Sequence, residues 1–98
     1  VGAVARYLGL LSATEARWEE AERHFTIAFE VNRRIGARPW LGHTQEDHAR
    51  MLFTRGQAGD AERALELVES AVATYRELGM ESHAARAAAL ARKLAYPS

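Results

Sequence analysis

The sequence predicts an all-α fold of about five antiparallel helices, and three observations lead to this prediction. Residues 15–36 match residues 58–79 without a gap, 43 positions further on, so that Ala21 aligns with Ala64. Residues 61–78 carry apolar side chains at three- and four-residue steps, which is the spacing of one helix face. The 98 residues include only two prolines and are rich in Ala, Leu and Glu, which favour helices. A fixed internal period of this size is typical of stacked helical hairpins.

The first two helices are predicted over residues 3–13 and 15–35. Thr14 is placed to cap the second helix, because a threonine oxygen accepts hydrogen bonds from the free N–H groups of a first turn. Acidic side chains lie near the beginning of this helix and basic ones near its end, the order that the helix dipole favours. Gly36 follows at the position where helices commonly end in a left-handed residue.

The third helix is predicted from Pro39 to Arg55, because the first helical position needs no N–H group. A turn rich in glycine follows, and Asp60 is placed to cap the fourth helix. Gly79 is predicted to end that helix, as its counterpart does in the first copy of the repeat. The loops that this assignment needs are short, as is usual between antiparallel helices.

A fifth helix is predicted from Ser82, its expected cap, to Tyr96. By the 43-residue period it is the first helix of a third hairpin that is incomplete. Repeat arrays expose apolar surface at their ends unless polar helices cover them. We therefore expect both ends to contact something: further repeats or neighbouring domains of a parent protein, or a second copy in a homodimer. The chain begins Val-Gly-Ala-Val, and we interpret it as a piece of a longer protein.

The residues at the expected helix contacts resemble the tetratricopeptide repeat. That motif has an apolar residue and a glycine in its first helix, then small, aromatic and small residues in its second. In the first copy these places are taken by Leu8, Gly9, Ala21, Phe25 and Ala28, and in the second by Met51, Leu52, Ala64, Val68 and Ala71. The resemblance implies a right-handed α-α superhelix with hairpins over 1–36 and 39–79 and a closing helix over 82–96. The period of 43 exceeds the 34 residues usual in that family, and its usual proline is missing from both copies.

A second resemblance concerns the tract from Ala21 to Leu41 and the later tract RGQAGDAERALELVESAV. Both are similar to the C-terminal helical regions of large bacterial ATP-binding transcription regulators and nucleotide-cyclase-like proteins. This implies a cytoplasmic signalling or transcription regulator as the parent, in which such repeats dock a partner. The chain has no phosphate loop, so any nucleotide chemistry would belong to other parts of that parent.

The repeat resemblance also implies that the first helix of each hairpin lines a concave binding surface. Equivalent positions on this surface form a basic stripe beside an apolar ladder. The residues that we expect to bind the partner are Arg6, Tyr7, Leu10, Arg50, Phe53, Arg92 and Lys93. They would suit an acidic-amphipathic peptide or protein segment. The alternative is a structural spacer or homodimerisation stack, with Leu10 and Phe53 in the core and the cations in solvent.

Other functions have little support. Thirteen basic and thirteen acidic side chains cancel, which argues against nucleic acid, and no apolar run approaches the ~20 residues of a membrane span. There is no cysteine, and no serine lies in a nucleophile-elbow motif, so we expect no enzyme activity and no cofactor. His43 and Asp47 are one turn apart, but His48 diverges from His43 by ~140° on a helix, so we expect no metal site. We expect Glu46 to pair with Arg50 on the helix surface.

Overall fold

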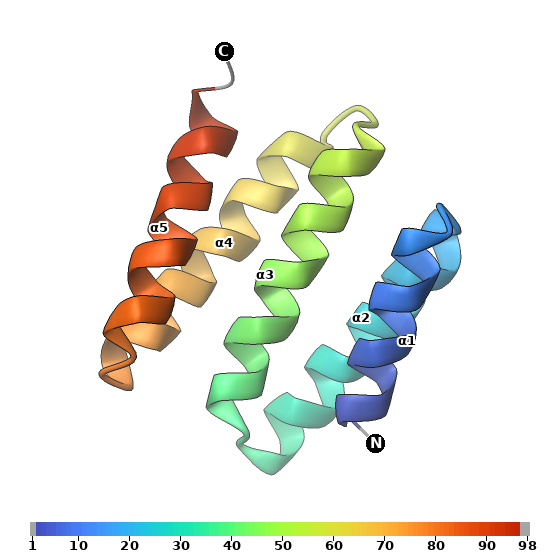
Figure 1. Ribbon diagram of the computed structural model, residues 1–98. Coiled ribbons are helices and arrows are strands. Elements are labelled where there is room, and N and C mark those ends of the chain that lie inside the picture. Colours follow the sequence, from blue (N-terminus) through green and yellow to red (C-terminus); the bar gives the residue numbers. More distant parts are fainter. Residues whose placement is uncertain (1, 97–98) are drawn as a thin grey trace.

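The computed structural model describes residues 2–96 and confirms the all-α prediction. Its elements are the helices α1 (Gly2–Thr14), α2 (Trp18–Ile35), α3 (Arg38–Arg55), α4 (Asp60–Glu77) and α5 (Glu81–Ala95). The helices are antiparallel and form two layers, with α1, α3 and α5 in front of α2 and α4 (Figure 1). Each helix packs against the next along the chain, and α1 also touches α3. No described helix is long and apolar enough to cross a membrane.

The core between the layers is built where a bulky side chain meets a small one. Phe25 is fully buried between Ala21 and Ala28, which are also without exposed surface. A Cβ atom at Gly9 would lie only 2.8 Å from the Phe25 ring, so glycine is what allows α1 to approach α2. Gly9 and Phe25 both stand at positions of the repeat motif that the sequence resembles.

In the second hairpin, the large and the small side chains lie on other helices than in the first. Leu52 replaces the motif glycine, and the smaller Val68 replaces phenylalanine; both are fully buried in the same core. A further notch appears at Gly42, where a Cβ atom would lie 2.7 Å from the ring of Tyr75. Each hairpin therefore has a glycine that makes room for an aromatic ring, but the two glycines occupy different positions of the repeat.

Several helix ends agree with the predictions. Gly36 and Gly79 follow α2 and α4 with φ of +71°, and the Gly36 N–H donates to the carbonyl oxygen of Arg33. Pro39 lies in the first turn of α3, which ends at Arg55 as predicted.

The predicted cap of the second helix is wrong. Thr14 belongs to α1, where its hydroxyl donates to the carbonyl oxygen of Leu10 at 3.0 Å. Residues 15–17 form a turn, in which Ala16 has φ of +58°, and α2 begins only at Trp18. Thr14 is therefore the last residue of α1 and does not cap α2, whose N-cap residue is Arg17.

The caps predicted at Asp60 and Ser82 are also wrong. Asp60 is the first residue of α4 and closes the preceding turn instead, accepting the Gln57 N–H at 3.0 Å and two hydrogen bonds from Arg55, both 2.8 Å. These bonds from Arg55 hold the pKa of Asp60 at about 2. Ser82 lies inside α5, which begins at Glu81.

A polar contact joins α2 to the second hairpin. Glu22 accepts hydrogen bonds from His48 at 3.3 Å, from Arg55 at 3.2 Å and from Arg63. The His48 ring also stacks on Phe25, with 5.5 Å between ring centroids. This network joins α3 and α4 to α2.

Candidate functional site

Three hollows open on the face made by α1, α3 and α5, and Arg50 lines all three. The first, which we call the polar pocket, has a volume of about 450 Å³ and is lined by Arg6, Trp40, His43, Glu46, Asp47, Arg50, His83 and Arg86. The second, the apolar groove, has about 440 Å³ and is lined by Arg50, Phe53, Thr54, Leu90, Lys93, Leu94 and Tyr96. A smaller hollow of about 230 Å³ lies between α1 and α3.

Glu46 lies at the base of the polar pocket, with 5% of its side chain exposed. Its carboxylate accepts two hydrogen bonds from Arg86, at 2.9 and 2.8 Å, one from the Tyr75 hydroxyl at 2.9 Å and one from Arg50 at 3.1 Å. Burial opposes ionisation, but the bonds from Arg86, Arg50 and Tyr75 outweigh it and lower the pKa of Glu46 to about 2. The expected pair with Arg50 is present, but its location on the helix surface was wrong because Glu46 is buried.

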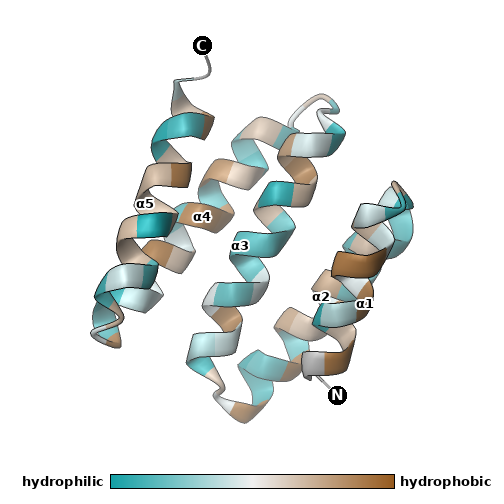
Figure 2. Ribbon diagram, in the orientation of Figure 1, coloured by the Kyte–Doolittle hydropathy of each residue, from teal (hydrophilic) through white to brown (hydrophobic). Residues whose placement is uncertain are grey.

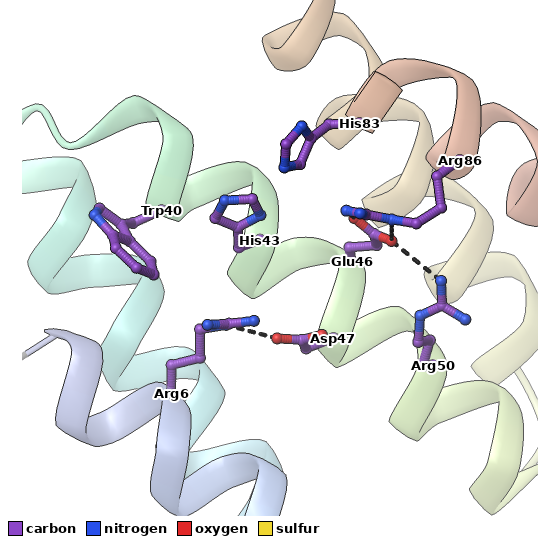
Figure 3. Close-up of a pocket in the computed structure, with 8 residues that line it drawn as sticks. All are labelled: Arg6, Trp40, His43, Glu46, Asp47, Arg50, His83 and Arg86. Carbon is purple, nitrogen blue, oxygen red and sulfur yellow. Dashed lines mark hydrogen bonds and ion pairs between the residues drawn. The ribbon is translucent and has the colours of Figure 1, made fainter. Parts of the chain in front are cut away.

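Asp47 forms a second ion pair in this pocket, with Arg6 of α1. Arg6 donates from Nε to the Asp47 carboxylate at 2.6 Å, and its guanidinium carbon lies 5.8 Å from the centre of the Trp40 ring. Burial raises the pKa of Asp47, although Arg6 partly opposes the shift. In Figure 3 this pair and the Glu46 cluster lie on adjacent sides of one pocket, with side chains from three helices.

Two histidines complete the polar pocket. The Tyr75 hydroxyl gives its hydrogen to Glu46, so Nδ1 of His43, 2.9 Å from the same oxygen, acts as the donor in that contact. The rings of His43 and His83 are 5.3 Å apart between centroids. Burial, with smaller effects from nearby Arg6 and His83, lowers the pKa of His43.

The side chains that were considered as metal ligands have other partners. Asp47 binds Arg6, and His48 faces Glu22 on the other side of α3 from the polar pocket. Among residues 2–96, no three His, Asp or Glu side chains are grouped so that they would hold a metal ion.

The apolar groove lies between α3 and α5. Phe53, 46% exposed, forms one wall, and Leu90 and Leu94 form the other. Arg50 and Lys93 add cationic groups to its lining. An apolar side chain with a neighbouring anion therefore has complementary surface here.

The structure distributes the seven predicted site residues unevenly. Arg6 and Arg50 line the polar pocket, Arg50, Phe53 and Lys93 line the apolar groove, and Leu10 lines the hollow between α1 and α3. Tyr7 and Arg92 are exposed but line none of these three hollows.

Sequence reasoning did not bring six residues of the polar pocket together as a site: Trp40, His43, Glu46, Asp47, His83 and Arg86. The repeat contained a signal for them, because Trp40 aligns with His83, and His43 with Arg86, at the 43-residue period. Equivalent positions on α3 and α5 thus contribute side chains to one pocket.

Comparison of the chain with protein-family models, with curated proteins and with solved structures gives no match. The resemblance to tetratricopeptide repeats therefore depends on the residues of the two hairpins alone.

Proposed function

We propose that this chain is a protein–protein interaction module that binds a peptide or protein segment on the face of α1, α3 and α5. The observation that carries the proposal is the apolar groove, where Phe53, Leu90 and Leu94 lie beside the cations Arg50 and Lys93. A partner segment with an apolar anchor next to an acidic residue fits both features.

The charge around Arg50 supports an acidic partner. Glu46 carries one negative charge but binds two guanidinium groups, and Arg86 supplies two of the three hydrogen bonds that come from arginine. Arg50 has one bond to Glu46 and 49% of its side chain exposed, so part of its charge and most of its donors remain for a ligand. Lys93 makes no ion pair among the described residues and adds a second cation.

The apolar groove supports a hydrophobic anchor. Partly exposed aromatic and aliphatic side chains that line a concavity are typical of the places where a few buried contacts supply most binding energy. Phe53 is such a side chain, since it is large and half-exposed beside the buried Leu94.

The wider biological setting belongs to the same proposal. The tetratricopeptide-like hairpins and the second sequence resemblance support a cytoplasmic bacterial signalling or transcription regulator as the parent. In that setting this segment would recruit a protein and would have no enzymatic role of its own.

A peptide-display selection tests the proposal. We expect short peptides that bind the chain to share an aliphatic or aromatic residue beside Asp or Glu. Their binding should be lost in the Phe53→Ser and Arg50→Glu variants and retained in Arg76→Glu, which reverses an exposed cation on α4. Peptides that bind all three variants equally, or a selection that enriches none, would exclude this face as the binding surface.

One observation favours the alternative, a structural spacer or homodimerisation stack. Several apolar side chains of α1 are exposed, and Figure 2 shows hydrophobic stretches along that helix. The exposed ones are Val4, Tyr7, Leu8, Leu10 and Leu11. Light scattering distinguishes the two functions: a dimer that Leu11→Glu converts to a monomer, while Arg50→Glu does not, supports the stack. A monomer that still binds the selected peptides excludes it.

A further inference from the structure

The arginines of the polar pocket use few of their hydrogen-bond donors. Arg6 donates to protein only through Nε, Arg50 only through Nη2, and Arg86 through Nε and Nη2. A guanidinium group carries five N–H donors. Among the described residues, both terminal nitrogens of Arg6, two nitrogens of Arg50 and one of Arg86 therefore have no protein acceptor.

The burial of the charged side chains determines whether positive or negative charge faces the pocket. The two carboxylates lie low, with 5% of the Glu46 side chain and 16% of the Asp47 side chain exposed. The guanidinium side chains lie above them, at 28% exposure for Arg6, 49% for Arg50 and 50% for Arg86. Three positive charges lie above one buried and one mostly covered negative charge, so the accessible surface of the pocket is cationic.

The other walls suit a small ligand with a flat organic group. Trp40 borders the pocket and is about half-exposed, so a part of its indole is open to a ligand. His83 comes from α5 opposite His43, and both rings lie near the guanidinium groups (Figure 3).

We propose that the polar pocket binds a phosphate monoester, whose phosphoryl group contacts Arg6, Arg50 and Arg86 while its organic group lies against Trp40. A phosphoryl group has three strong acceptor oxygens and a charge of about −1.5 to −2 at neutral pH. It can therefore accept from guanidinium groups that approach from three helices, whereas a carboxylate has only two oxygens. The polar pocket and the apolar groove share only Arg50, so the proposal does not depend on a peptide ligand.

Phenyl phosphate is the probe that tests this site. Trp18→Phe leaves Trp40 as the only tryptophan, so its fluorescence reports on the pocket. We expect saturable quenching in that background, weakened about tenfold or more by Arg50→Gln, because a hydrogen bond to a charged group is lost. Arg76→Gln should bind as the parent does.

Arg50→Gln is expected to fold, because Arg86 and Tyr75 still hold Glu46; circular dichroism and thermal unfolding check this. An absence of saturable binding, or equal binding by Arg50→Gln and Arg76→Gln, would overturn the proposal. Phenol should not compete with phenyl phosphate for the polar pocket, since the phosphoryl group is the part that is recognised.

A phosphoserine peptide distinguishes the source of the ligand. Saturable binding of either compound supports the phosphoryl site; tighter binding of phenyl phosphate indicates a small metabolite, and tighter binding of the phosphopeptide indicates a modified protein. Phe53→Ser separates this proposal from the previous one, because it should abolish peptide binding in the apolar groove and leave phenyl phosphate binding unchanged.

Discussion

Arg86 on α5 holds the buried carboxylate of Glu46 on α3 through two hydrogen bonds of 2.9 and 2.8 Å. The two residues are 40 positions apart, and α4 connects their helices. Tyr75 of α4 donates to the same carboxylate, so one acidic group joins three helices. The same group also orients Arg50, the residue common to the three hollows.

The first prediction concerns the unequal roles of the two arginines. Arg86→Ala should lower the free energy of unfolding by about 2–3 kcal/mol, because it removes two charge-assisted bonds from a buried carboxylate. Arg50→Ala should cost less than about 1 kcal/mol, since the Arg50 side chain is half-exposed and Glu46 keeps its other partners. Urea denaturation measures both.

A double-mutant cycle provides the control for this prediction. In a Glu46→Gln background, Arg86→Ala should cost much less than it does in the parent chain, because no buried charge is left unpaired. Equal losses for the two arginines, or the same loss in both backgrounds, would contradict the role given to Glu46.

The second prediction concerns pH. The folded pKa of Glu46 is about 2 and its ordinary value is 4.5, so its contribution is complete above pH 4.5 and is lost as the pH falls from there toward 2. This loss should amount to about 3 kcal/mol at most. Asp47 shifts the opposite way and offsets a part of it. Urea midpoints followed below pH 4.5 should fall steeply in the parent and much less in Glu46→Gln; parallel curves would contradict the assignment.

The third prediction concerns the histidines in a higher pH range. Burial lowers the pKa of His43 and His48 from 6.5, so the unfolded chain takes up protons before the folded one does. Their contribution is therefore complete above pH 6.5 and declines as the pH falls below it. His48→Gln should reduce the slope of stability against pH in this range. An unchanged slope in both His48→Gln and His43→Gln would contradict the prediction.

The sequence predicted those parts of the fold that depend on residues close together in the chain. The Ala21, Phe25 and Ala28 pattern is local and repeated, so it predicted the helices and their contacts. The cap at Thr14 failed because Thr14 ends α1 and α2 begins only at Trp18, and the cap at Asp60 failed because its carboxylate accepts from Arg55 and from the Gln57 N–H. Propensity alone does not reveal such competition.

The candidate site was harder to predict for the same reason. Glu46 resembles any acidic residue on a solvated helix, and its burial follows from Tyr75 and Arg86, which lie 29 and 40 positions away. Arg50 and Phe53 were predicted because the repeat resemblance places them on the concave side of the first helix. Tyr7 is equivalent to Arg50, and Arg92 to Arg6, at the 43-residue period, but neither side chain lines one of the three hollows.

The fourth prediction tests the notch between α1 and α2. Gly9→Ala should destabilise the chain by about 1–3 kcal/mol, because the new methyl group overlaps the Phe25 ring. The second hairpin suggests the compensation, since it places the larger residue, Leu52, on α3 and the smaller one, Val68, on α4. Combining Gly9→Ala with Phe25→Val should therefore cost less than the sum of the single losses; simple additivity in urea unfolding would contradict the contact.

The most direct test of the central claim is to map a bound peptide by NMR on the isotopically labelled chain. The peptide from the selection should shift the amide signals of residues 50–54 on α3 and 90–95 on α5, with the signals of α2 unchanged. Shifts confined to α2 and α4, or to the exposed apolar side of α1, would show that the face around Arg50 is not where the partner binds.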